Sequence, residues 1–122
     1  AGKTDPILVT VHSFTPIYNG RERSVEIGIL HDNDTRLADA LLRTAPKHTA
    51  AVVERNAPYG PEHGVTHTLK EHALPSGCLN VMLEIRNDLI TEAGQQDAMA
   101  KTIANWLSDA LASLKIEQAV RC

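Results

Sequence analysis

Short apolar runs rich in β-branched residues alternate along this chain with segments of helical periodicity. The runs predict strands at about 7–12, 25–30, 49–54 and 79–86. One helix is predicted after Asp34 and stops at Pro46, and a longer one begins near Thr91. Strands that alternate with helices favour a mostly parallel sheet with helices on its faces. The sequence therefore predicts an α/β fold.

The longer helix has a continuous apolar face, which predicts that it packs on the sheet. This face consists of Met99, Ile103, Trp106, Leu107, Ala110, Leu111 and Leu114. The earlier helix follows the capping residues of the Asp32-Asn33-Asp34 sequence. A third, weaker helical pattern covers about 66–74.

Length and composition limit the classes of protein that the chain can belong to. With 122 residues there is room for one domain, and a strand-like run that begins at Ile7 without a preceding Met suggests a chain entered midway. We therefore expect residues 1–122 to form a single α/β domain segment. A net charge of −3 and an aromatic content of 3% argue against nucleic acid and membrane surfaces as partners. Self-association is left open.

Two cysteines, Cys78 and Cys122, are too few for a disulfide framework and lack the spacing of a zinc or redox pair. We expect free thiols in a reducing compartment. No apolar run reaches the roughly 18 residues of a membrane span. The expected location is the cytoplasm.

Two of the predicted strands end in polar residues. His12 closes the first strand, and Glu84 lies near the end of the last one, followed by Arg86. Ligands of open α/β sheets bind beyond the carboxyl ends of the strands. A histidine at such a position can offer a ring nitrogen to a metal, although it can also be a hydrogen-bonded turn residue.

Glu84 is unusual because it interrupts the apolar Val81–Ile85 run. An ionised carboxylate in such a run is costly unless it is paired, close to a metal or ready to transfer a proton. Alternation places Glu84 on the same face as Arg86, so a structural ion pair between them, or with a neighbouring strand, is an equally open interpretation.

The other histidines offer weaker evidence for a site. His31, His48, His63 and His67 are expected to be solvated residues of loops or helix ends. His72 could point into a site and is a second-rank candidate. The sequence contains no nucleophile elbow, phosphate-binding loop or dinucleotide fingerprint, so serine-hydrolase and nucleotide chemistry have no support.

Several blocks taken together resemble the N-formylglutamate amidohydrolase family. They are Val11-His12-Ser13-Phe14-Thr15-Pro16, then Asn19-Gly20-Arg21-Glu22-Arg23 leading into Glu26-Ile27-Gly28-Ile29-Leu30, then Asn56-Ala57-Pro58-Tyr59, and finally Leu83-Glu84-Ile85-Arg86-Asn87-Asp88-Leu89-Ile90. Their order covers nearly the whole chain.

This resemblance implies a zinc-carboxypeptidase-like α/β architecture and hydrolysis of an N-acyl amino acid, such as N-formyl-L-glutamate, to formate and glutamate in histidine breakdown. It implies that His12 is a zinc ligand and Glu84 the general base. Arg86 or Arg23 is then expected to bind the developing oxyanion or the substrate carboxylate. Asn56, Tyr59, His72 and Arg23 match recurring polar positions and are expected to bind substrate.

The chain also departs from the family pattern. Family members are longer, and their N-terminal portion carries a histidine and an acidic residue that complete the zinc site. The resemblance therefore implies that residues 1–122 are the C-terminal portion of a longer hydrolase domain. Ala57 stands where the family often has an acidic residue. A related zinc deacylase or carboxypeptidase-like enzyme with another substrate, or a non-catalytic binding domain of the same fold, are the alternatives.

Overall fold

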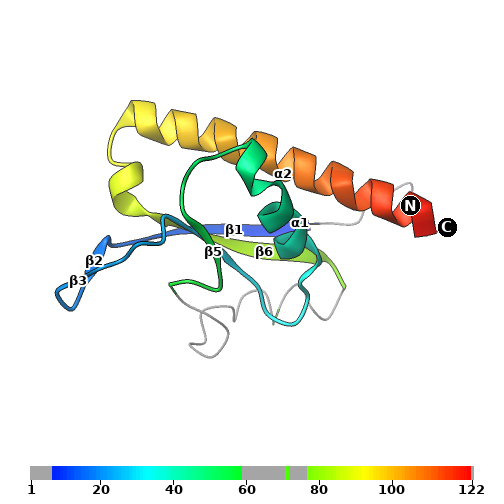
Figure 1. Ribbon diagram of the computed structural model, residues 1–122, viewed down its shortest axis with the longest axis horizontal. Helices are drawn as coiled ribbons and strands as arrows, with labels where there is room; N and C mark the ends of the chain where they lie inside the picture. Colours follow the sequence, from blue (N-terminus) through cyan, green and yellow to red (C-terminus); the bar gives the residue numbers. More distant parts are fainter. Residues whose placement is uncertain (1–6, 59–70, 72–76, 122) are drawn as a thin grey trace.

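A four-stranded sheet covered on one face by two helices forms the body of the described structure (Figure 1). The structure is a computed structural model and describes residues 7–58, 71 and 77–121. The strands of this sheet are β1 (Ile7–Phe14), β4 (Ile27–Leu30), β5 (Val53–Arg55) and β6 (Leu79–Arg86). The helices are α1 (Arg36–Thr44) and α2 (Ala93–Arg121), and short 3₁₀ turns follow α1 at Ala45–Lys47 and β6 at Asn87–Leu89.

The sheet has the order β1-β6-β4-β5 and is mixed but mostly parallel. β1 is parallel to β6, and β4 is parallel to β5, whereas β4 and β6 are antiparallel. The α/β class and the mostly parallel sheet are therefore confirmed. The predicted strand at 49–54 is displaced, because residues 49–52 form the approach to a shorter β5.

A small two-stranded ribbon, β2 (Ile17–Tyr18) and β3 (Arg21–Glu22), projects beyond the end of β1 (Figure 1). Asn19 and Gly20 both have positive φ, at 53° and 74°. This is the conformation of a tight hairpin turn, for which Asn-Gly is the preferred sequence. No strand was predicted here, although the turn signal is present.

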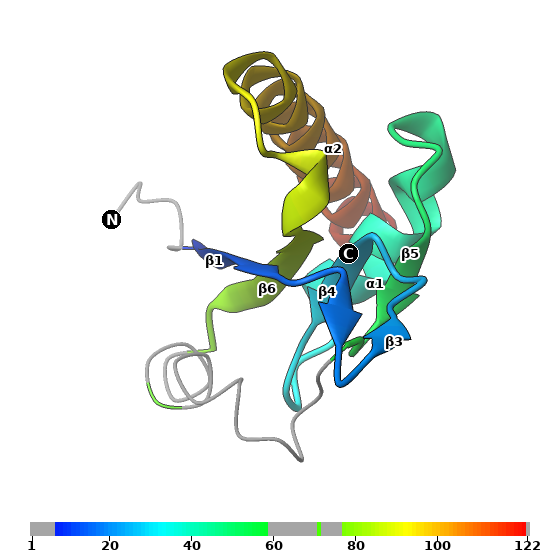
Figure 2. The same ribbon diagram turned by 90° about the vertical axis from the view of Figure 1, so that its left-hand side faces the viewer.

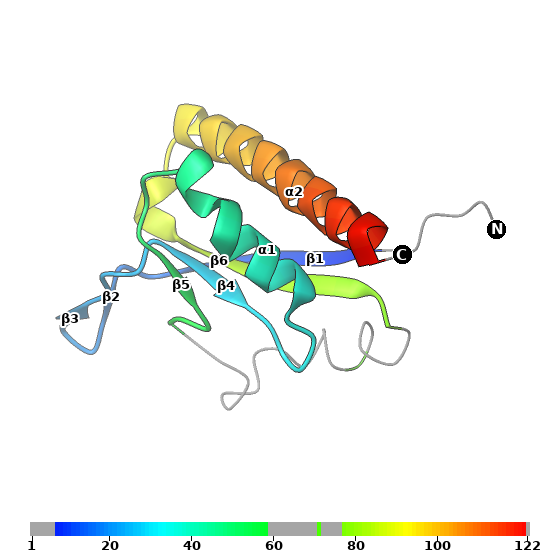
Figure 3. The same ribbon diagram turned by 45° about the vertical axis from the view of Figure 1, so that its right-hand side comes forward.

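The main core lies between the sheet and the helices. Ile27 and Ile29 of β4 and Val81 and Leu83 of β6 are completely buried against α1 and α2. Figure 3 shows the two helices side by side over the same face of the sheet. The predicted apolar face of α2 is confirmed, since all seven of its residues belong to this core or pack against it.

The two helices are also joined by a buried hydrogen bond. Trp106 of α2 is completely buried and donates from Nε1 to the carbonyl oxygen of Leu41 in α1, at 2.8 Å. The N-cap residue of α1 is Thr35, one position after the predicted capping sequence, and its side chain makes no capping hydrogen bond. Asp34 instead accepts a hydrogen bond from the backbone N–H of Arg36 at 3.1 Å. The predicted helix at 66–74 lies outside the described residues.

Side chains alternate across the sheet, so the face opposite the helices carries a different set of residues. Leu8, Leu30 and Met82 form a small second apolar cluster there. Glu84 lies on this face, two residues beyond Met82 in the same strand. No helix in the part of the chain that the structure describes is long and apolar enough to span a membrane.

Candidate active site at the ends of β1 and β6

His12 and Glu84 are register partners in the parallel pair formed by β1 and β6. Partners in neighbouring strands lie on the same face of a sheet, with strands about 4.8 Å apart. Glu84 is only 5% exposed, whereas His12 is exposed to solvent. Both residues lie toward the carboxyl ends of their strands, so the structure brings together the two predicted strand-end groups.

The environment of Glu84 favours its neutral form. One carboxyl oxygen, Oε2, is buried and has no hydrogen-bond partner. Burial raises the pKa of Glu84 above its ordinary value, and the nearby His12 and Arg23 side chains partly oppose this shift. A buried carboxyl with a raised pKa and an unused oxygen is typical of a group that exchanges protons.

Arg23 lies in the loop after β3 and is held there by two aromatic rings. Its guanidinium carbon is 4.8 Å from the centre of the Tyr18 ring and 5.5 Å from that of Phe14. Nη1 donates to the carbonyl oxygen of Thr15 at 3.0 Å. These contacts orient a cation whose charge acts on Glu84.

Arg86 has a different environment, although it belongs to the same strand as Glu84. Its guanidinium donates to both carboxylate oxygens of Asp88, at 2.7 and 3.2 Å, and to the backbone carbonyl of Arg23, at 2.8 Å. Oε2 of Glu26 lies 3.8 Å from Nη2 of Arg86. The structural ion pair with Glu84 that alternation allowed is not formed between these two described residues, because Arg86 pairs with Asp88 and Glu26 instead.

Asn56 anchors the loop that follows β5. Its backbone has a φ of 50°, its N–H donates to the Ile29 carbonyl at 2.9 Å, and its Oδ1 accepts from the N–H of His31 at 3.0 Å. These bonds tie the loop to the end of β4 on the neighbouring strand. The side-chain oxygen of Asn56 therefore has a structural role in this loop.

The same loop approaches the sheet beside Glu84. Gly28 is the register partner of Glu84 in the antiparallel pair of β4 and β6. A Cβ atom at position 28 would overlap the carbonyl oxygen of Ala57. Because Gly28 has no side chain, the Ala57 backbone can contact the sheet next to Glu84. A glycine inside a strand often marks such a close approach of another backbone segment.

His31 is buried, which corrects the expectation of a solvated histidine. It is 8% exposed, and its Nδ1 lies 2.7 Å from the Asp32 carbonyl oxygen. Its Nε2 lies 2.9 Å from Nη1 of Arg55, which also binds Asp39 at 2.6 Å. This network at the end of β4 depends on contacts distant in sequence, so periodicity gave no sign of it.

His48 also differs from the expectation. Its Nε2 lies 2.8 Å from Oδ2 of Asp109, which links the segment after α1 to α2. The hydrogen bond from His48 lowers the pKa of Asp109. Tyr59, His63, His67 and His72 lie outside the described residues.

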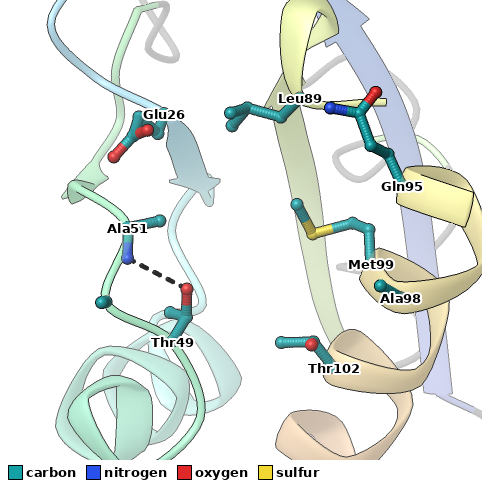
Figure 4. A pocket seen from close by; sticks show the side chains of 9 residues that line it. Glu26, Thr49, Ala51, Leu89, Gln95, Ala98, Met99 and Thr102 are labelled. Carbon is teal, nitrogen blue, oxygen red and sulfur yellow. Dashed lines mark hydrogen bonds between the residues drawn. The ribbon is translucent and has the colours of Figure 1, made fainter. Parts of the chain in front are cut away.

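A separate cavity on the helix side does not belong to this site. It has a volume of about 500 Å³ and lies between α2 and the approach to β5. Figure 4 shows Glu26, Thr49 and Ala51 on one side of it and Gln95, Met99 and Thr102 on the other. Neither His12 nor Glu84 lines it, so it offers no access to the buried carboxyl.

Comparison with known proteins identifies the family of this chain. Residues 1–91 match the family model described as N-formylglutamate amidohydrolase. The crystal structure of a gene product from Agrobacterium tumefaciens is 58% identical, with a TM-score of 0.88 over 91% of this chain and 44% of that one. This chain therefore spans less than half the length of that relative. No curated protein matches it.

The match over residues 1–91 covers most of the chain, which is enough to assign it to a family. More specifically, it belongs to the N-formylglutamate amidohydrolase family.

Proposed function

We propose that this chain supplies the general base and one metal ligand of a zinc-dependent amide hydrolase with a zinc-carboxypeptidase-like architecture. The proposed substrate is an N-acyl amino acid, N-formyl-L-glutamate, and the products are formate and L-glutamate. The observation that supports this most directly is the buried, unpaired Glu84 carboxyl beside His12, in a chain of this family.

The donor atoms of the described residues fit one part of a zinc site. His12 offers an exposed ring nitrogen of the type that zinc prefers, and Glu84 lies beside it. Catalytic zinc usually takes three protein ligands, and no group of three His, Cys, Asp or Glu suited to a metal occurs among residues 7–58, 71 and 77–121. The remaining ligands are therefore proposed to come from outside this described set. Zinc bound there would supply positive charge that polarises the acyl carbonyl and acidifies a water molecule.

Glu84 is proposed to carry the proton through the reaction. It accepts a proton from the attacking water as the new C–O bond forms, and it returns that proton to the nitrogen as the C–N bond breaks. A raised pKa makes the Glu84 carboxylate a stronger base, which favours the first of these transfers.

Arg23 is the better of the two proposed partners for anionic groups of the substrate. Its charge acts on Glu84 and lowers the pKa of that carboxyl, whereas the close ion pair of Arg86 is with Asp88. We propose that Arg23 binds the substrate carboxylate or the developing oxyanion and that Arg86 holds the Arg23 backbone in place. Asn56, Tyr59 and His72 remain proposed substrate-binding residues.

The decisive experiment measures formate release from N-formyl-L-glutamate by the longest native protein that contains this chain, with zinc added. Glu84→Gln should keep zinc and lose most of the rate, at least about a hundredfold. Glu54→Gln, which changes an exposed strand carboxylate, is the matched control.

Zinc content, measured on the same preparations, tests the ligand assignment. His12→Ala should lower the bound zinc, whereas the neighbouring exposed Ser13→Ala should not. Full zinc in His12→Ala would remove His12 from the metal site. Zinc-dependent turnover of other N-acyl amino acids, with none of N-formyl-L-glutamate, would assign a related deacylase, and a folded protein without zinc or turnover would assign a binding domain.

A further inference from the structure

The contacts of the buried His31 ring specify one protonation state. The arginine side chain carries only N–H donors, so Nε2 of His31 must accept the hydrogen bond from Nη1 of Arg55, at 2.9 Å. The backbone carbonyl oxygen of Asp32 can only accept, so Nδ1 of His31 must donate to it, at 2.7 Å. The two contacts together require a neutral ring with its proton on Nδ1.

Arg55 is held in place for this contact from the helix side. Its Nη2 donates to Oδ1 of Asp39 in α1 at 2.6 Å, and the Thr35 hydroxyl donates to the other oxygen of that carboxylate at 3.0 Å. Figure 2 shows α1 close to β4 and β5, at the end of the sheet away from β1. The ring of His31, which directly follows β4, is thus joined through hydrogen bonds to both β5 and α1.

His31 holds the loop after β5 through its backbone as well as through its ring. Its N–H donates to Oδ1 of Asn56 at 3.0 Å. Arg55 and Asn56 are consecutive, so two neighbouring residues of the loop are both bonded to His31. The next residue is Ala57, whose backbone contacts the sheet beside Glu84.

Protonation of His31 would remove the acceptor that Arg55 uses. An imidazolium ring has an N–H donor at each nitrogen, so a proton on Nε2 would oppose the Arg55 guanidinium across 2.9 Å, donor against donor and cation against cation. Among the described residues, the other charges that act on the ring are the carboxylates of Asp39 in α1 and of Asp34 just before it. Asp39 is already bonded to Arg55, and Asp34 is bonded to Arg36. Neither carboxylate therefore replaces the lost hydrogen bond.

We infer that His31 is a pH-sensitive clasp for the loop that follows β5. The neutral ring holds this loop against the end of β4, and protonation of the ring releases it. His31 is a positioning residue, because it acts through Asn56, which is proposed to bind substrate. Only this effect on catalysis rests on the proposed function, since the clasp itself consists of contacts within the fold.

Nitrogen-15 NMR of the longest native protein that contains this chain tests the clasp without substrate. At pH 8 the His31 ring should be the neutral Nδ1–H tautomer. As acid protonates the ring, the hydrogen-exchange protection of the Asn56 amide should fall about tenfold, the effect of one lost hydrogen bond. His31→Gln offers Arg55 an acceptor that does not titrate, so its Asn56 protection should stay constant. His48→Gln is the matched control and should leave the fall in place, because His48 bonds to Asp109 instead.

An Nε2–H tautomer at pH 8 would overturn the inference. So would a ring that stays neutral until the protein unfolds, or a ring that is protonated without any loss of Asn56 protection.

Activity is measured separately. If the protein hydrolyses N-formyl-L-glutamate, its KM should rise as the His31 ring is protonated, and His31→Gln should abolish that rise. A rise that persists in His31→Gln would remove the positioning role. A protein that has the pH-dependent clasp but no hydrolysis would retain this inference and lose the proposed function.

Discussion

Gly28 and Ala57 are in backbone contact across the sheet face beside Glu84, and the contact leaves no space for a side chain at position 28. The Ala57 carbonyl oxygen lies where a Cβ of residue 28 would be. Through this contact the loop anchored by Asn56 reaches the candidate site.

Gly28→Ala should therefore displace the loop and destabilise the protein by about 1–3 kcal/mol, the usual cost of overpacking. Gly94→Ala is the control, because a Cβ there meets no atom within 4 Å and alanine favours the helix. Urea unfolding of both variants measures the difference. Equal stability of Gly28→Ala and the unaltered chain would mean that the loop does not rest on β4.

The buried carboxyl of Glu84 should make stability depend on pH. Because its pKa is raised in the folded state, the folded protein binds this proton more tightly than the unfolded chain. That contribution is fully present below the unfolded pKa of about 4.5 and is lost as pH rises through the folded pKa. Each pKa unit of difference corresponds to about 1.4 kcal/mol.

Glu84→Gln should consequently be more stable than the unaltered chain at pH 8, and this advantage should shrink toward pH 4. Urea midpoints at the two pH values provide the measurement, and Glu54→Gln should show no such trend. A Glu84→Gln variant that is less stable at pH 8 would show that the ionised carboxylate has a stabilising partner.

Arg23 and Arg86 should be separable by the pH dependence of activity. The charge of Arg23 lowers the pKa of Glu84, so Arg23→Gln should raise that pKa and move the acid limb of kcat/KM to higher pH. Arg86→Gln should instead lower stability through the lost contacts to Asp88, with the acid limb in place. If the acid limb of kcat/KM moved in Arg86→Gln and not in Arg23→Gln, Arg86 would be the residue whose charge acts on Glu84, and Arg23 would have the structural role.

Trp106 should be a major source of stability because it is completely buried and bonded to Leu41. Trp106→Ala should cost about 3–5 kcal/mol. Trp106→Phe keeps most of the apolar volume and should cost about 1–3 kcal/mol, since it removes the short buried hydrogen bond to the Leu41 carbonyl, which keeps the longer one from Thr44 at 3.4 Å. Thermal unfolding followed by circular dichroism measures both, with the exposed Asn105→Ala as the control.

The sequence predicts those elements whose periodicity is set by the core. The apolar stripe of α2 and the alternation of β6 both depend on one face packing against the other layer, so both were predictable. The run at 49–54 was misplaced because apolar content alone does not show where pairing with β4 begins. The Asn19-Gly20 turn was readable but lies in a ribbon too short for a strand pattern.

The candidate site was predictable only in part. His12 and Glu84 were both recognisable as polar residues near strand ends, but their pairing depends on a register that no local pattern specifies. The contacts of Arg86 with the Arg23 carbonyl and of His31 with Arg55 join residues 63 and 24 positions apart. Such contacts are created by the fold, so composition and periodicity cannot reveal them.

Glu84 lies in β6, which pairs with β1 on one side and with β4 on the other. Leu83 points to the helix face of the sheet, and the Glu84 carboxyl lies on the opposite face. One inserted residue upstream in β6 would reverse this alternation, sending the carboxyl into the helix layer and an apolar residue into its place. Two inserted residues would keep the orientation but shift the carboxyl by about 6.6 Å along the strand. Insertions should therefore be tolerated in the turns around β6 but not within the strand, because the alternation of side chains along β6 also determines where the Glu84 carboxyl lies.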